Sequence, residues 1–206
     1  MGTRIRLAIP EDGAALSAIY APAVSDRATS FELDVPSAAE MARRVASLTL
    51  RMPWLVCEHG AEVAGYAYAS PHRDRAAYQW SVEVSAYVAS RMQRRGVGDA
   101  LYTSLFAVLE LQGFRTAYAG ITLPNDASVA FHTTLGFKPV GVYRGVGYKL
   151  GRWHDVAWFE RPLAARTADP LPPRPLPDIV SDARFAAALL AGVARLSSSP
   201  ETTPRG

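Results

Sequence analysis

The sequence lacks several features that would define other classes of protein. Only one of its 206 residues, Cys57, is a cysteine, so no disulfide can form within the chain and a reducing compartment is expected. No apolar stretch reaches the roughly 18 residues that a membrane-spanning helix needs. The N-terminal residues have no hydrophobic core of a signal peptide. The sequence therefore predicts a cytoplasmic protein that does not insert into membranes.

An excess of charge of one sign is also missing. The chain has 22 lysines and arginines against 19 acidic residues, a net charge of +3, and no long basic run. This mild excess does not predict binding to nucleic acid, but it suits a small anionic ligand. With 49% hydrophobic and 20% charged residues, the chain can bury a sizeable core.

Motifs for metal or covalent catalysis are absent from the sequence. The histidines lack the spacing of a metal site; they are His59, His72, His132 and His154. His59 and His72 fall in turns and are interpreted as surface residues. No Gly-x-Ser-x-Gly elbow is present, and Cys57 follows an apolar run, where a buried thiol is usually inert. We expect no bound metal and no covalent acyl-enzyme.

Periodicity predicts a mixed α/β protein. Strands are expected at 4–9, 54–58, 62–68, 80–88, 114–122, 140–150 and 155–161. Helices are expected after Pro10, after the capping box of Ser37 and Glu40, from about 97 to Gly113, and from Asn125 to Gly136. Because this order mixes hairpins with βαβ crossovers, we expect a mixed sheet with helices on both faces.

The composition changes near residue 164. We expect a domain over residues 1–163, followed by a proline-rich tail over 164–206 with one helix at about 182–196 and a disordered end. The sequence leaves open whether this tail packs on the domain, packs on a partner subunit or is a floppy appendage.

A glycine-containing turn carries the clearest chemical signal. The segment Gln-Arg-Arg-Gly-Val-Gly at 93–98 lies between a predicted strand and a predicted long helix. Glycines allow backbone N–H groups to approach an anion closely, and the start of a helix adds free donors and the positive end of its dipole. The two arginines add mobile positive charge. This turn is therefore predicted to bind a pyrophosphate.

Two other interpretations of the turn fit less well. A dinucleotide-binding fingerprint requires an acidic residue at the end of the next strand, and residues 114–122 contain none. A P-loop requires Gly-Lys-Ser or Gly-Lys-Thr, which is also missing. A helix N-terminus that binds nothing stays an open alternative from this motif alone.

The same motif in its wider context resembles a known family. Gln-x-x-Gly-x-Gly between a strand and a helix, followed by Asn125 and by Leu-Gly-Phe at 135–137, is similar to the GNAT acetyltransferase superfamily. The phosphinothricin N-acetyltransferase branch is the closer resemblance, carried by residues 29–32, 65–69, 75–78, 82–83, 87–88, 123–126, 145–149 and 151–156. It spans about residues 4–163 and implies a mostly antiparallel sheet splayed between its fourth and fifth strands.

The resemblance implies where acetyl-CoA binds. Its pyrophosphate is expected on the turn and its pantetheine arm along the edge of the fourth strand. The residues so implied are Tyr87, Val88, Gln93, Arg94, Arg95, Gly96, Val97, Gly98, Asn125 and Ser128. The edge of the fourth strand is also expected to donate an N–H to the thioester carbonyl.

The resemblance also implies catalytic residues. Glu83 takes the position of a general base that removes a proton from the amine; without the resemblance, it would be interpreted as facing solvent or pairing with an arginine. His132, four residues before Gly136, is expected to donate a proton, share the role of base or only pack near the ligand. Tyr102 and Tyr118 are interpreted as core or surface residues.

The implied substrate is a small amino-acid-like amine. Arg73 and Arg75 offer guanidinium groups that suit a carboxylate or phosphinate, with Phe31 covering the aliphatic part and Tyr78 assisting; Lys149 and His154 are noted only as near the pocket mouth. We expect acetylation of phosphinothricin or methionine sulfoximine in a ternary complex, by a homodimer. Acetylation of a peptide N-terminus or polyamine, and a non-catalytic acyl-CoA-binding module, stay alternatives.

Overall fold

The computed structural model describes residues 2–197 of the chain. In this range, one seven-stranded sheet has the order β1-β2-β3-β4-β5-β7-β6. The strands are β1 (Thr3–Leu7), β2 (Trp54–His59), β3 (Glu62–Pro71), β4 (Ser81–Val88), β5 (Thr116–Thr122), β6 (Lys138–Lys149) and β7 (Arg152–Pro162). Neighbouring strands run antiparallel except β4 and β5, which are parallel. The mixed sheet predicted from the sequence is confirmed.

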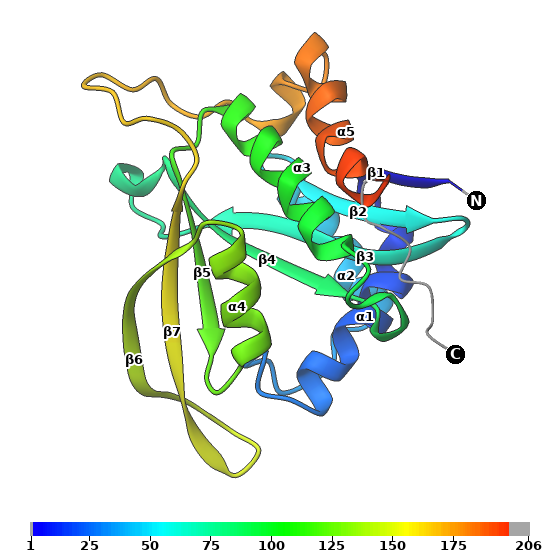
Figure 1. The fold of residues 1–206 in the computed structure, drawn as a ribbon, viewed down its shortest axis with the longest axis vertical. Helices are drawn as coiled ribbons and strands as arrows, with labels where there is room; N and C mark the ends of the chain where they lie inside the picture. Colours follow the sequence, from blue (N-terminus) through cyan, green and yellow to red (C-terminus); the bar gives the residue numbers. More distant parts are fainter. Residues whose placement is uncertain (1, 198–206) are drawn as a thin grey trace.

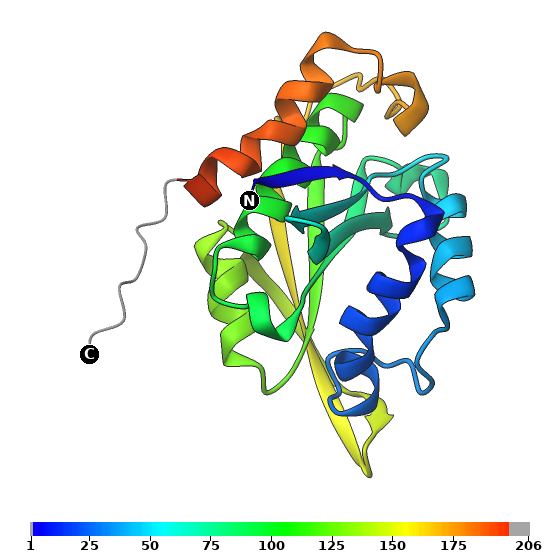
Figure 2. The ribbon, with the colours of Figure 1, turned by 90° about the vertical axis from the view of Figure 1, so that its right-hand side faces the viewer.

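Helices cover both faces of the sheet (Figures 1 and 2). They are α1 (Gly13–Ser25), α2 (Ala38–Leu48), α3 (Val97–Gln112), α4 (Asp126–Thr134) and α5 (Ala183–Ser197). On one face, Leu16 of α1 and Val45 of α2 pack with Trp54 of β2. On the other, Leu101 and Leu105 of α3 pack in the main core. None of the described helices is long and apolar enough to cross a membrane.

Local sequence signals set several helix ends. Ser37 Oγ accepts a hydrogen bond of 3.2 Å from the backbone N–H of Glu40 and begins α2. Asn125 Oδ1 accepts a hydrogen bond of 3.2 Å from Ser128 N–H and begins α4. Gly113, with φ of 100°, ends α3 in the left-handed conformation. The helix boundaries predicted from these residues are confirmed.

The parallel pair β4–β5 separates partway along its length. The two strands pair only from Ser81 to Glu83, opposite Thr116 to Tyr118. Beyond Glu83 they diverge, and both strands line one cavity there. The splay expected between the fourth and fifth strands is therefore present, and Glu83 marks its closed end.

The proline-rich tail packs on the domain rather than extending away from it. Gln112 Nε2 donates to the carbonyl oxygens of Arg51 (2.9 Å) and Arg174 (2.8 Å), and Trp80 Nε1 donates to that of Leu171 (2.9 Å). Apolar residues continue this contact around Val108 of α3: they are Leu176, Ile179, Phe185 and Ala188. Of the alternatives left open for the tail, the floppy appendage is wrong for the described residues.

Helix α5 lies along α3 at very short range (Figure 1). Ser104 Oγ of α3 donates to the carbonyl of Leu189 at 2.7 Å and accepts from Gly192 N–H at 3.0 Å. Gly192 lies at this crossing, and a side chain there would clash with the backbone of Ala100 in α3. Two helices this close therefore require a glycine. The domain boundary near residue 163 stays a prediction, and the disordered end predicted from Ser197 onward falls almost wholly outside the described residues.

Candidate active site

A cavity of about 230 Å³ opens where β4 and β5 diverge. Its wall includes Ile19 and Pro22 of α1 from one face of the sheet, and Tyr102 of α3 and His132 of α4 from the other. The cavity thus reaches both faces, because no strand fills the gap between β4 and β5. An extended ligand lying in it would be accessible to a second molecule from the opposite face.

The turn at 93–96 leads into α3 beside this cavity. Gly96 has φ of 78° at the helix N-cap, and Arg94 has φ of 59°, a conformation that non-glycine residues rarely adopt. The first N–H groups of α3 have no partner within the helix and are free to bind an anion. Arg94 and Arg95 are exposed and add charge, whereas the Val97 side chain is buried in the core. Val97 can therefore contribute only backbone.

Gly98 allows α4 to approach α3. A Cβ at Gly98 would lie 3.1 Å from the ring of Phe131 in α4, closer than side chains usually pack. Phe131 also stacks on Tyr102, with ring centroids 5.7 Å apart. The second glycine of the motif thus serves helix packing, and it keeps the wall formed by α4 next to the start of α3.

Five of the residues assigned to the cofactor line the cavity directly: Tyr87, Val88, Gln93, Asn125 and Ser128. Gln93 Nε2 donates to the carbonyl of Val88 at 3.5 Å. Since β5 no longer pairs with β4 beyond Glu83, this edge of β4 can hydrogen-bond to an amide-bearing ligand. Tyr87 packs edge-on against Tyr20 at 4.8 Å, and burial raises the pKa of the Tyr87 hydroxyl, which stays neutral.

His132 is held as a neutral imidazole. Its Nδ1 lies 2.8 Å from the carbonyl oxygen of Ser128, which can only accept, so Nδ1 carries the proton. Its Nε2 then accepts from the hydroxyl of Tyr102 at 3.3 Å. Burial lowers the pKa of His132, and a backbone hydrogen bond opposes that shift only in part. The geometry does not fit an imidazolium acid.

Tyr102 is a site residue that the sequence analysis missed. It is fully buried, as a core residue would be, yet it lines the cavity and bonds to His132. Burial raises the pKa of its hydroxyl, which stays protonated. Its place in the second turn of α3, after the glycine turn, was the one signal that could have indicated it.

Glu83 lies just beyond the cavity, at the closed end of the splay. The next two residues of β4, Val84 and Ser85, line the cavity, whereas Glu83 itself does not. Its Oε1 accepts from His72 Nδ1 and from Arg73 Nη1, both at 3.1 Å. The side chain is about one-third exposed. Both interpretations of Glu83 thus have support, since it borders the site and also pairs with an arginine.

The residues assigned to the substrate fall into two groups. Arg73 lies 5.8 Å from the ring of Trp158 in β7, and the exposed Arg75 and Tyr78 follow it. Phe31 instead lies 6.2 Å from His154. His154 and Trp158 are four residues apart on β7, so their Cα atoms are about 13 Å apart. The two groups therefore contact β7 at different points along the strand.

Lys149 fixes the segment that carries Phe31. Its buried Nζ donates to the carbonyl oxygens of Ser30 and Glu32, both at 2.7 Å. Burial lowers the pKa of Lys149. The Phe31 ring occupies the space above Gly147, where a Cβ would lie 2.3 Å from it. Sequence reasoning noted Lys149 only as near the pocket mouth, because the contact joins segments almost 120 residues apart.

Comparisons with known proteins agree with this geometry. The GNAT acetyltransferase domain family matches residues 5–158. A phosphinothricin N-acetyltransferase of Streptomyces viridochromogenes is 41% identical over 84% of this chain and 92% of its own length. An L-methionine sulfoximine/L-methionine sulfone acetyltransferase of Salmonella typhimurium is 33% identical over 80% and 96%.

A solved structure shows the same arrangement. The phosphinothricin acetyltransferase from Sinorhizobium meliloti, in complex with acetyl-CoA, superposes with a TM-score of 0.78 at 36% identity, over 83% of this chain and 94% of that one. This chain thus has a splayed sheet, a glycine turn at the start of α3 and a family match over most of its length. The protein belongs to the GNAT family of N-acetyltransferases.

Proposed function

We propose that this protein transfers the acetyl group of acetyl-CoA to the α-amino group of a small amino-acid-like substrate of the phosphinothricin or methionine sulfoximine type. The observation that carries this proposal is the cavity that reaches both faces of the sheet, with a carboxylate and guanidinium groups at its closed end. Donor and acceptor can meet there directly, in a ternary complex. The names of the relatives support the substrate class.

The residues present fit acetyl-CoA. The N-terminus of α3 with Gly96, Gly98 and the two neighbouring arginines would hold its pyrophosphate. The free edge of β4 at Tyr87 and Val88 would hold its pantetheine amides, with Gln93, Asn125 and Ser128 around them. When bound, the cofactor supplies an acetyl group activated as a thioester.

Glu83 is proposed as the general base. An α-amino group is mostly protonated at neutral pH and must lose a proton before it can attack. Glu83 Oε1 is held by two donors, so Oε2 is the oxygen free to take this proton. His132 is proposed to orient the Tyr102 hydroxyl at the cavity wall as a neutral partner, rather than to act as a charged acid.

Substrate recognition is proposed for the two groups at either end of the site. Arg73 and Arg75 present guanidinium groups that match a carboxylate or a phosphinate, and the exposed Tyr78 follows them in the same loop. Phe31 would cover the aliphatic chain from the opposite end, since Lys149 and Gly147 hold it over the sheet. The pocket is thus built for an acceptor with anionic groups rather than for a polyamine.

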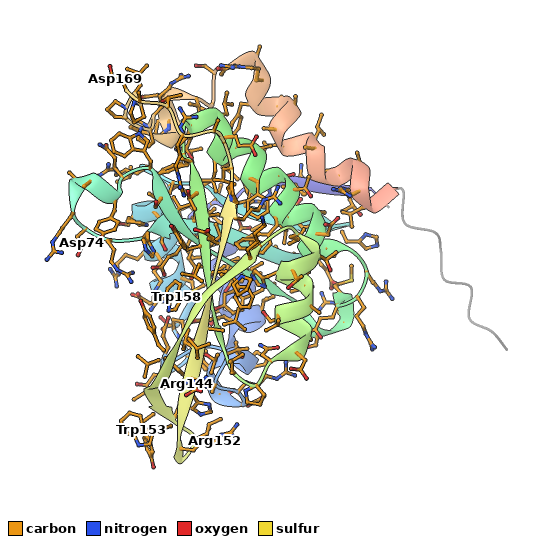
Figure 3. All side chains as sticks on the ribbon, turned by 60° about the vertical axis from the view of Figure 1, so that its left-hand side comes forward. Asp74, Arg144, Arg152, Trp153, Trp158 and Asp169 are labelled. Atoms are coloured by element: carbon orange, nitrogen blue, oxygen red, sulfur yellow. The ribbon has the colours of Figure 1, made fainter. Side chains whose placement is uncertain are left out.

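A homodimer located in the cytoplasm is part of the proposal. The β6–β7 hairpin extends from the body of the molecule, and Figure 3 shows Trp153, Arg152 and Arg144 towards its tip. Strand β6 is the edge of the sheet. The hairpin exposes Val140, Val142, Tyr143, Val146, Tyr148, Leu150 and Trp153. Such an apolar edge is suited to a second copy of the chain.

The decisive experiment is a thiol-release assay with acetyl-CoA and a panel of amines. The panel contains phosphinothricin, methionine sulfoximine, proteinogenic amino acids, polyamines and an N-terminal peptide. We expect saturable release of CoA with the first two and little with the others. Release with peptides or polyamines alone would overturn the proposed substrate class. Tight binding of acetyl-CoA without release for any amine would instead favour a non-catalytic acyl-CoA-binding module.

A further inference from the structure

His72 is not the surface histidine that its place in a turn suggested. Its side chain is only 14% exposed. The imidazole stacks on Tyr118 of β5, with ring centroids 4.4 Å apart and planes 17° apart. It also meets the edges of Tyr78 and Trp158, each at 6.0 Å. Rings from three separate segments therefore fix the imidazole in one orientation.

This orientation directs His72 at the proposed base. Its Nδ1 lies 3.1 Å from Glu83 Oε1, and because a carboxylate oxygen only accepts, Nδ1 donates in this bond. Arg73 Nη1 donates to the same oxygen at 3.1 Å. Both donors hold Oε1, which leaves Oε2 without a partner among the described residues. Figure 3 shows Trp158 near the middle of the molecule and Asp74 at the tip of the loop that carries both donors.

We propose that His72 is a positioning residue for the proposed general base: its stacked imidazole fixes Glu83 so that Oε2 receives the amine proton. This inference rests on the proposed function. In the proton transfer, an N–H bond of the substrate ammonium breaks, an O–H bond forms at Oε2, and the lone pair stays on nitrogen. The carboxyl proton passes to water before the next cycle. His72 keeps its bond to Oε1 throughout and neither gains nor loses a proton.

Two substitutions separate positioning from a structural role. His72→Asn keeps a donor near the place of Nδ1. His72→Phe keeps the stacking on Tyr118 but loses the donor. His59→Asn is the matched control, because His59 is an exposed histidine at the end of β2, bonded to Thr3 at the other end of the sheet. Each variant is compared with the wild type in CoA release with phosphinothricin.

We expect His72→Phe to lower kcat about tenfold with an unchanged KM for acetyl-CoA. His72→Asn should recover most of that loss, because its amide N–H can still donate to Glu83 Oε1. The His59→Asn variant should follow the wild type throughout. A wild-type rate for His72→Phe, or a rate for His72→Asn no higher than that of His72→Phe, would overturn the proposal.

A second measurement does not depend on activity or on the stability of a His72 variant. The ring nitrogens of His72 are observed by NMR in the wild type and in Glu83→Leu, which has no acceptor at this place. We expect the Nδ1–H form in the wild type and loss of that preference in Glu83→Leu. The same form in both would overturn the pairing. If no amine supports CoA release by the wild type, the proposed function fails, and this NMR result still decides whether His72 and Glu83 are coupled.

Discussion

His132 Nδ1 lies 2.8 Å from the carbonyl oxygen of Ser128, one turn earlier in α4. This bond and the burial of the ring together keep His132 neutral, since burial lowers its pKa. The unfolded chain takes up a proton at this histidine near about pH 6.5, whereas the folded protein does so only at lower pH. Between these two pKa values the unfolded state binds more protons, so the free energy of unfolding falls as pH falls.

We therefore predict that His132 makes the protein less stable in mild acid. Its contribution is fully present above about pH 6.5 and is lost below it, by at most about 1.4 kcal/mol per pH unit. Urea unfolding on both sides of this value should show a smaller loss for His132→Asn than for the wild type. His59→Asn, which removes an exposed imidazole, is the control. An equally steep loss in His132→Asn would contradict the prediction.

Replacing the proposed base tests its role in catalysis. Glu83→Gln should lower kcat by about a hundredfold or more, because the amide cannot take up a proton. Acetyl-CoA affinity should stay nearly intact, since Glu83 does not line the cavity. Steady-state kinetics and titration calorimetry measure the two effects. The control is Glu62→Gln, which breaks an exposed ion pair with Arg91. Unchanged turnover would remove Glu83 from the mechanism.

Lys149→Met tests the fixed position of Phe31. The change leaves the carbonyls of Ser30 and Glu32 without their donor, at a cost of about 1–3 kcal/mol for each group that stays buried. We expect a lower melting temperature and a higher KM for the amine, with KM for acetyl-CoA little changed. Lys138→Met, at an exposed lysine that begins β6, should affect neither. The prediction is wrong if KM for the amine stays at the wild-type value.

Gly192→Ala tests the close contact of α5 with α3. Alanine inside a helix normally stabilises it by about 1 kcal/mol relative to glycine. At Gly192, however, a Cβ would lie 1.9 Å from the carbonyl oxygen of Ala100. We expect destabilisation by about 1–3 kcal/mol instead, because the helices must move apart. Chemical unfolding measures whether the variant is less or more stable than the wild type. Ala187→Leu, at an exposed position of α5, is the control and should be nearly neutral.

Most of the elements and the glycine turn could be predicted from local signals in the sequence. Ser37 and Asn125 begin their helices through bonds to N–H groups three residues away, and alternation along β4 placed Glu83 on its polar face. These signals act between near neighbours in the chain, so that periodicity and composition record them. The motif at 93–98, with its resemblance to a family, then predicted the cofactor beside that strand.

The tertiary structure alone decided which side chains meet. The stacking of His72 on Tyr118, the bonds from Lys149 to the segment around Phe31 and the packing of Gly192 on Ala100 join positions about 46 to 119 residues apart. The sequence suggested a surface position in a turn for His72 and a core or surface position for Tyr102. Local sequence patterns do not show which residues a side chain contacts. Such contacts depend on how whole strands and helices pack, and packing is a property of the complete fold rather than of any local segment.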